Sequence, residues 1–203
     1  MFTGAKELFY YFGAISCPCF TRRRTQERAS FGRGFLYMER WDLLDENGNL
    51  TGKTMIRGRS MRAGQYHLVV HIWVVDNKGR ILLQRRAPTR RLMPGVWAAT
   101  GGSAVAGEDS ETAARRELEE ELSICTKPGE MQHIAHLRRR NAFTDVWLLK
   151  RDVDASSLTL QTEEVAEVRW VTEQELRVMI VKGDFHNYGR LYFDTVMSAL
   201  RKA

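Results

Sequence analysis

The sequence contains few cysteines, and their spacing argues against a disulfide-stabilised protein. Cys17 and Cys19 are separated by a single residue, and Cys125 is far from both. The segment Cys17-Pro18-Cys19 is not a CxxC pair, and no second Cys/His pair stands at the spacing of zinc ligands. We therefore expect a reduced, cytoplasmic protein without a cysteine-bound zinc ion.

Long apolar runs, internal repeats and low-complexity segments are also absent. The apolar stretch at residues 8–20 is far shorter than the ~20 residues that a membrane-spanning helix needs. It does not match a secretory signal, because only Lys6 precedes it and no small-x-small cleavage site follows. We expect no membrane span and assign residues 1–38 to a basic and aromatic extension of unknown role. A targeting signal, or a natural start at Met38, is the alternative.

The net charge of +6 is unevenly distributed along the chain. Residues 1–40 hold seven basic and three acidic side chains, a balance of +4 that leaves +2 for the rest. A mildly basic body suits a polyanionic small molecule as well as a nucleic acid. We expect a small-molecule substrate rather than a nucleic acid. The oligomeric state stays open, with a homodimer as one option.

From residue 40 onwards, segments rich in β-branched and aromatic residues alternate with turn residues and helical segments. Thr172 and Glu175 have the spacing of a helix capping box. The mixture of strands and helices predicts an α/β (α+β) domain over residues 39–203. The pattern predicts strands at 41–44, from 50, and at 66–75, 80–84, 131–138, 144–151 and 166–171, and helices at 109–122, from 172, and at 189–200.

The helix predicted at 109–122 has an acidic face. Glu117, Glu120 and Glu121 stand at positions i, i+3 and i+4, so their carboxylates share one side of the helix. An exposed, solvated helix is the alternative for an isolated acidic run. Carboxylates this close repel one another, and a divalent cation would offset that repulsion. Oxygen ligands at this spacing suit Mg²⁺, with Mn²⁺ as a substitute.

The surrounding sequence fits a longer pattern, Gly-x5-Glu-x7-Arg-Glu-U-x-Glu-Glu-x-Gly-U, in which U is apolar. One position departs, because Ser123 replaces a glycine; serine adopts the left-handed conformation of a helix C-cap at a cost of about 1 kcal/mol. Together with residues 94–97 and 164–171, the pattern resembles the Nudix hydrolase family, whose defining box would be residues 102–124. The matching residues are Gly102, Glu108, Arg116, Glu117, Leu118, Glu120, Glu121 and Ile124.

The resemblance implies a fold and a chemistry. Nudix domains are α/β/α sandwiches with a mixed central sheet, so residues 39–203 would form such a domain. The similarity implies an Mg²⁺-dependent hydrolase that cleaves a diphosphate linkage in a nucleoside diphosphate derivative or a related organic diphosphate. The cations would neutralise phosphate oxygens and lower the pKa of a bound water, and a carboxylate would remove its proton.

Candidate metal ligands follow from the same resemblance. Glu117 and Glu121 match the usual metal-binding carboxylates. Glu120 matches a carboxylate that binds metal or activates water. The backbone carbonyl of Gly102, or that of Gly101, matches a further ligand.

The resemblance also implies catalytic and structural roles. Arg116 and Glu108 match an ion pair that holds the helix against the preceding loop. We group Arg116 with Glu120 and Glu164 as catalytic, because an arginine beside clustered carboxylates orients them and offsets their repulsion. Glu164 falls where some members place an additional glutamate. Glu163 is its rival, so the residue that activates water stays open.

Basic and histidine side chains give further candidates. Arg85 and Arg86 would hold substrate phosphates or lie in a solvated loop, and the run at residues 138–140 is expected in a hairpin turn with the same two alternatives. His67 and His71 share one side of a predicted strand. We interpret them as hydrogen-bonded sheet residues rather than metal ligands.

Two other functions stay open. Residues 41–48, 67–71 and 94–97 look like the Nudix branch that includes isopentenyl-diphosphate isomerases. Their chemistry needs a cysteine just after the position of Trp97, where this chain has Ala98-Ala99. The other alternative is a non-catalytic Nudix module that binds a nucleotide or RNA.

Overall fold

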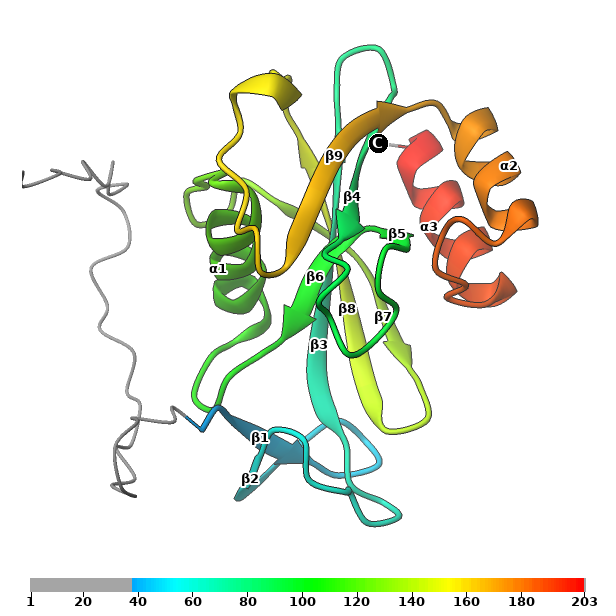
Figure 1. The fold of residues 1–203 in the computed structure, drawn as a ribbon. Coiled ribbons are helices and arrows are strands. Elements are labelled where there is room, and N and C mark those ends of the chain that lie inside the picture. The colour runs from blue at the N-terminus through cyan, green and yellow to red at the C-terminus, as the bar shows by residue number, and fades with distance from the viewer. Residues whose placement is uncertain (1–37, 203) are drawn as a thin grey trace, which may run out of the picture.

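Strand β3 (His67–Val75) is the centre of the fold because both of its faces are apolar. Val70, Ile72 and Val74 belong to the core on one side of the sheet, and Trp73 belongs to the core on the other. The computed structural model describes residues 38–202, and β3 runs through the middle of its main sheet (Figure 1).

The main sheet has seven strands in the order β5-β4-β3-β8-β7, with β6 paired to β3 and β9 paired to β4. Strands β3 and β8 are parallel, whereas β4, β6, β7 and β9 are antiparallel to their partners. The sheet is therefore mixed, as predicted. The bounds are β4 (Ile81–Arg86), β5 (Trp97–Ala98), β6 (Thr100–Ser103), β7 (Gln132–Arg138), β8 (Ala142–Lys150) and β9 (Val165–Val171).

A separate hairpin, β1 (Arg40–Leu44) and β2 (Leu50–Ile56), lies beyond one end of β3 (Figure 1). Its turn forms because the Asp45 carboxylate accepts hydrogen bonds from the backbone N–H groups of Asn47 and Asn49, at 2.8 and 2.9 Å. The Asp42 carboxylate accepts a hydrogen bond from the N–H of Gly107 at 2.7 Å. The hairpin is thereby fixed against the loop that precedes α1.

Helices cover both faces of the main sheet (Figure 1). Helix α1 (Ser110–Leu122) lies on one face, and α2 (Glu173–Lys182) and α3 (Arg190–Lys202) lie on the other. A short 3₁₀ turn, η1 (Ala155–Ser157), precedes β9. The arrangement is an α/β/α sandwich with a mixed central sheet, which confirms the predicted fold class.

The helix ends agree with the local sequence. The hydroxyl of Thr172 and the carboxylate of Glu175 form the predicted capping box of α2. Ser123 ends α1 in the left-handed conformation, with φ of 56°. Its hydroxyl donates to the carbonyl of Thr159 at 2.9 Å, which offsets part of the cost of that conformation.

Residues 1–37 lie outside the described residues, and with them Cys17, Cys19 and the basic run at 22–24. The assignment of residues 1–38 to an extension therefore stays a prediction. In the part of the chain that is described, no helix combines the length and apolar character needed to cross a bilayer.

Candidate active site

Helix α1 presents its carboxylates because its opposite face is buried. Ala113, Ala114, Leu118 and Leu122 have no exposed surface and pack against the sheet. The Asp109 side chain starts the helix by accepting a hydrogen bond from the N–H of Thr112 at 2.7 Å. This apolar face therefore fixes the rotation of the helix. The acidic stripe of Glu117, Glu120 and Glu121 faces a cleft.

Arg116 contacts two carboxylates of the acidic stripe and also Glu108. Its guanidinium holds the Glu108 carboxylate in a two-point contact at 2.8 and 3.0 Å. One further nitrogen donates to Glu117 at 2.8 Å and to Glu120 at 3.2 Å. The last contact goes to the Ser103 carbonyl at 3.1 Å. These contacts use the five donors of the guanidinium, so Arg116 positions the carboxylates that surround it.

Glu121 is a carboxylate in an interior position, only 4% exposed. Its Oε2 accepts a hydrogen bond from Nε2 of Gln84 at 2.9 Å, and Gln84 in turn accepts one from the Thr100 hydroxyl at 3.2 Å. Burial, followed by the charge of Glu117, raises the Glu121 pKa to about 8. Among residues 38–202, Glu121 forms no ion pair with an arginine or lysine, so a cation would stabilise its charged form.

Glu117 lies directly over β6. A Cβ atom added to Gly102 would stand 2.4 Å from the Glu117 Oε1, so only glycine leaves room for this carboxylate. Burial raises the Glu117 pKa, although Arg116 acts against that shift. The close approach brings the Glu117 carboxylate against the backbone of Gly102, which sequence spacing alone could not show.

The chemistry of these groups fits a divalent cation. Glu117 and Glu121 are buried oxygen donors that carry more negative charge than their surroundings offset, and Glu120 stands beside them at 32% exposure. Within residues 38–202, no three acidic, histidine or cysteine side chains are already arranged to hold a metal. The carboxylates are oriented by Arg116 and Gln84 instead, so they would have to turn towards a cation.

The acidic stripe forms one wall of a cleft of about 1370 Å³. Glu164, at the start of β9, also lines it, whereas Glu163 is exposed outside it and Glu167 forms a 3.5 Å ion pair with Arg85. Glu164 is itself held by Arg90 at 2.5 Å. Of the glutamates near β9, the structure therefore brings Glu164 to the acidic stripe.

The two neighbouring arginines on β4 point in different directions. Arg86 lines the cleft, whereas Arg85 is exposed, pairs with Glu167 and bonds the Gly95 carbonyl at 3.0 Å. Successive side chains of a strand project to opposite faces, which explains the difference. The other candidate site residues all line the cleft: Gly101, Gly102, Glu108, Arg116, Glu117, Glu120, Glu121 and Glu164.

Beside Arg86, the cleft is lined by one residue of the predicted basic turn and by two residues that the sequence did not single out. Arg139 comes from the β7–β8 hairpin, which forms where residues 138–140 were predicted to turn. His186 and Tyr188 come from the segment between α2 and α3. All of them line the cleft. Neither histidine nor tyrosine belongs to a recognisable motif, so only the tertiary structure could reveal their position.

His67 and His71 line the floor of the cleft. His71 exchanges a hydrogen bond with the Tyr192 hydroxyl at 2.9 Å, as expected for a sheet histidine. The His67 ring stacks on Trp41 at 4.2 Å, but its buried Nδ1 has no hydrogen-bond partner. The expectation that both are hydrogen-bonded is therefore correct for His71 and wrong for Nδ1 of His67.

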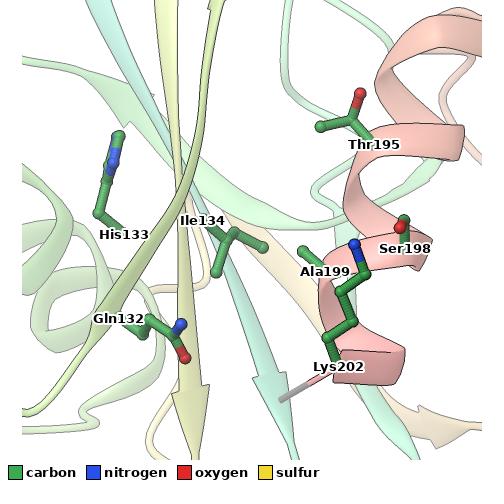
Figure 2. Close-up of a pocket in the computed structure, with 7 residues that line it drawn as sticks. All are labelled: Gln132, His133, Ile134, Thr195, Ser198, Ala199 and Lys202. Atoms are coloured by element: carbon green, nitrogen blue, oxygen red, sulfur yellow. The ribbon is translucent and has the colours of Figure 1, made fainter.

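A second, smaller pocket of about 420 Å³ lies between β7 and α3. Figure 2 shows Ile134 directed towards α3 and His133 directed away from it. The lining residues include no carboxylate, so this pocket lacks the groups that make the larger cleft a candidate active site. They are Gln132, His133, Ile134, Thr195, Ser198, Ala199 and Lys202.

Known proteins resemble this chain in sequence and in fold. The family model of the NUDIX domain matches residues 65–191, which include the whole acidic stripe. An uncharacterised Nudix hydrolase of Listeria monocytogenes is 42% identical over 152 residues, which cover 74% of this chain and 90% of that protein.

Two further comparisons bear on branch and fold. The isopentenyl-diphosphate Delta-isomerase of Streptomyces avermitilis is 30% identical over 170 residues, covering 80% of this chain and 83% of that protein. The crystal structure of DR0079 from Deinococcus radiodurans matches with a TM-score of 0.67 at 24% identity, covering 78% of this chain and 98% of that one. The structural match supports the fold assignment.

Proposed function

The chain belongs to the Nudix hydrolase family, and from this premise we propose that it is an Mg²⁺-dependent hydrolase of a diphosphate linkage. The substrate would be a nucleoside diphosphate derivative or a related organic diphosphate, and Mn²⁺ would substitute for Mg²⁺. The observation that carries the proposal is the position of Glu117 and Glu121 in one wall of the cleft, where the Glu117 side chain is only 12% exposed and Glu121 is buried. Burial, followed for Glu121 by the charge of Glu117, raises the pKa of both carboxyls.

Each group of the acidic stripe has a proposed role. Glu117, Glu121 and the Gly102 carbonyl would hold the cation, with Glu120 as a further donor or as the base. When bound, the cation would neutralise phosphate charge and lower the pKa of a water molecule. Arg116 keeps the carboxylates apart and oriented, and Glu108 ties Arg116 to the loop.

We propose Glu120 as the group that takes the proton from the attacking water. Its side chain is 32% exposed, whereas those of Glu117 and Glu121 are buried, so Glu120 can meet water in the cleft. Glu164 lines the same cleft, but its carboxylate is held by Arg90. Glu164 would therefore position the substrate or the metal rather than remove the proton from water.

The test is hydrolysis of a panel of nucleoside diphosphate derivatives and organic diphosphates with Mg²⁺ or Mn²⁺. Glu120→Gln should lower kcat by about 10²- to 10⁴-fold, the usual contribution of a general base. Glu119→Gln is the matched control, because Glu119 is a neighbouring carboxylate outside the motif, and it should retain activity. Full activity of Glu120→Gln would exclude Glu120 as the base, and failure of the wild type on every substrate would refute the hydrolase.

The likeness to an isopentenyl-diphosphate isomerase makes isomerisation the second candidate. Isomerase chemistry needs a cysteine after Trp97, and here Ala98 and Ala99 fill that position. Within residues 38–202 the one cysteine is Cys125, and it does not line the cleft. These observations favour hydrolysis. Conversion of isopentenyl diphosphate by the wild type, without hydrolysis of any panel member, would reverse the choice.

A further inference from the structure

The wall of the cleft made by Arg86, Arg139 and His186 is an unassigned cationic surface. Arg86 donates through Nε to the Leu92 carbonyl at 3.0 Å, which leaves its two outer nitrogens directed elsewhere. The Arg139 guanidinium lies 5.8 Å from the centre of the Tyr188 ring. Within residues 38–202, neither arginine forms an ion pair with a carboxylate, although both are only half-exposed.

Arg40 and Arg140 also line the cleft, but both are exposed. Three other arginines of the cleft differ from Arg86 and Arg139 because they are paired with carboxylates. Arg57 is paired with Glu39 at 2.7 Å, Arg90 with Glu164 at 2.5 Å, and Arg116 is surrounded by carboxylates. Their positive charge is therefore already offset. Arg86 and Arg139 keep theirs for a ligand.

The three groups lie close enough for their charges to act on one another. The charges of Arg139 and Arg86 both lower the pKa of His186, after the larger effect of its burial. Arg86 also acts on the acidic wall, since its charge lowers the pKa of Glu121 against the effect of burial. An anion bound by Arg86 and Arg139 would thus lie in the same cleft as the carboxylates.

Tyr188 gives this wall a fixed shape. Its ring packs against His186 at 4.5 Å and His71 at 4.7 Å between centroids. Its hydroxyl accepts a hydrogen bond from the backbone N–H of Ala99. The aromatic support holds His186 and Arg139 in place, so the cationic wall is preorganised rather than a set of free surface side chains.

We propose that Arg86, Arg139 and His186 form an anion-binding subsite for a second anionic group of the substrate, a phosphomonoester or a carboxylate that is not part of the scissile diphosphate. The two arginines present the forked donors that suit either oxyanion. That this anionic group belongs to the substrate rests on the proposed hydrolase function, but the anion site itself does not. The preferred substrates would then carry anionic charge at both ends of the cleft.

The sequence offers a matched control for this proposal. Arg85 and Arg138 are direct neighbours of Arg86 and Arg139, yet neither lines the cleft: Arg85 pairs with Glu167, and Arg138 stacks on Tyr66 at 4.9 Å. The double variants Arg86→Gln/Arg139→Gln and Arg85→Gln/Arg138→Gln have the same net charge. They differ in whether the lost charges face the cleft.

The first experiment titrates the full chain with inorganic phosphate in the presence of EDTA and monitors binding by NMR or calorimetry. The cleft double variant should bind phosphate at least about tenfold more weakly, because a charge-assisted hydrogen bond contributes about 1.5–3 kcal/mol. The control double variant should stay within about twofold of wild type. Equal affinity of the cleft variant and wild type, or an equal loss in both variants, would overturn the proposal. Thermal melting of each variant checks folding.

Acetate and a phosphomonoester separate the two ligand sources. Competition by a simple phosphomonoester alone indicates a phosphate group in the substrate, and competition by acetate as well indicates that carboxylates are accepted. In steady-state assays, the cleft double variant should raise KM for substrates with an additional anionic group and leave KM unchanged for those without one. Phosphate binding without hydrolysis would refute the proposed function and keep the anion site.

Discussion

The two walls of the cleft differ in the sign of their charge and in how far ion pairs offset that charge. On the acidic wall, one guanidinium, that of Arg116, contacts Glu108, Glu117 and Glu120, so the carboxylates outnumber it. On the basic wall, Arg86 and Arg139 have no carboxylate partner among the described residues. Each wall therefore carries charge that the ion pairs within it do not offset. The proposed cation and the proposed anion would each offset the charge of a different wall.

The largest expected difference in stability is between a variant that loses the arginine of the acidic wall and a variant that loses an arginine of the basic wall. Arg116→Gln should lower the free energy of unfolding by about 3–5 kcal/mol, because it leaves buried carboxylates without their partner. Arg86→Gln should change it by less than about 0.5 kcal/mol, since no ion pair is broken. Chemical denaturation of the metal-free proteins measures both values. Similar losses in the two variants would remove the distinction between the walls.

The floor between the walls gives a pH-dependent effect of intermediate size. Burial, then the charge of Arg57, lowers the His67 pKa from 6.5 to about 4. The folded protein therefore disfavours protonation of His67, so this contribution to stability is complete above pH 6.5 and is lost as the pH falls towards 4. By pH 4 the loss should reach about 3 kcal/mol.

His67→Phe checks this assignment, because phenylalanine keeps a ring against Trp41 and cannot titrate. Unfolding measured from pH 7 to pH 4 should show a shallower loss of stability in the variant than in the wild type. Parallel curves for the two proteins would show that His67 is not the group responsible.

The smallest expected effect lies at the end of the helix that carries the acidic wall. Ser123→Gly should relieve the left-handed backbone but lose the hydrogen bond to the Thr159 carbonyl, so the net gain in stability should stay below about 1 kcal/mol. Ser123→Ala loses the hydrogen bond and keeps the strain, and it should be less stable than both. Denaturant midpoints rank the three proteins, and a more stable alanine variant would contradict this account.

Features that depend on neighbours in sequence were predictable. The caps at Asp109 and Thr172 depend on side chains that reach backbone groups three residues away, and the structure confirms the helices that follow them. The left-handed Ser123 follows from its place at the end of a helical pattern. The shared face of the box glutamates depends only on the helical repeat.

Features that depend on distant contacts were not predictable from one sequence. Gln84 reaches Glu121 because β4 lies beneath α1, and a lone glutamine in an apolar strand gives little sign of such a bond. His186 and Arg139 meet Arg86 although they come from different parts of the chain. The contrast between Arg85 and Arg86 required the register of β4, because a shift by one residue would exchange their directions.

The sequence by itself determined the family, the elements and the acidic stripe, because each of these is encoded in local spacing and periodicity. The tertiary structure alone decided which glutamates are buried, which of the described arginines form no ion pair, and that the two sets line one cleft. Burial and pairing depend on groups brought together from separate strands and loops, and a pKa changes with the whole surroundings of a carboxylate. The acidic half of the cleft could therefore be located from sequence. For the basic half, the sequence offered Arg86 and residues 138–140 as phosphate contacts, but only the folded chain distinguishes Arg86 and Arg139 from their neighbours and adds His186.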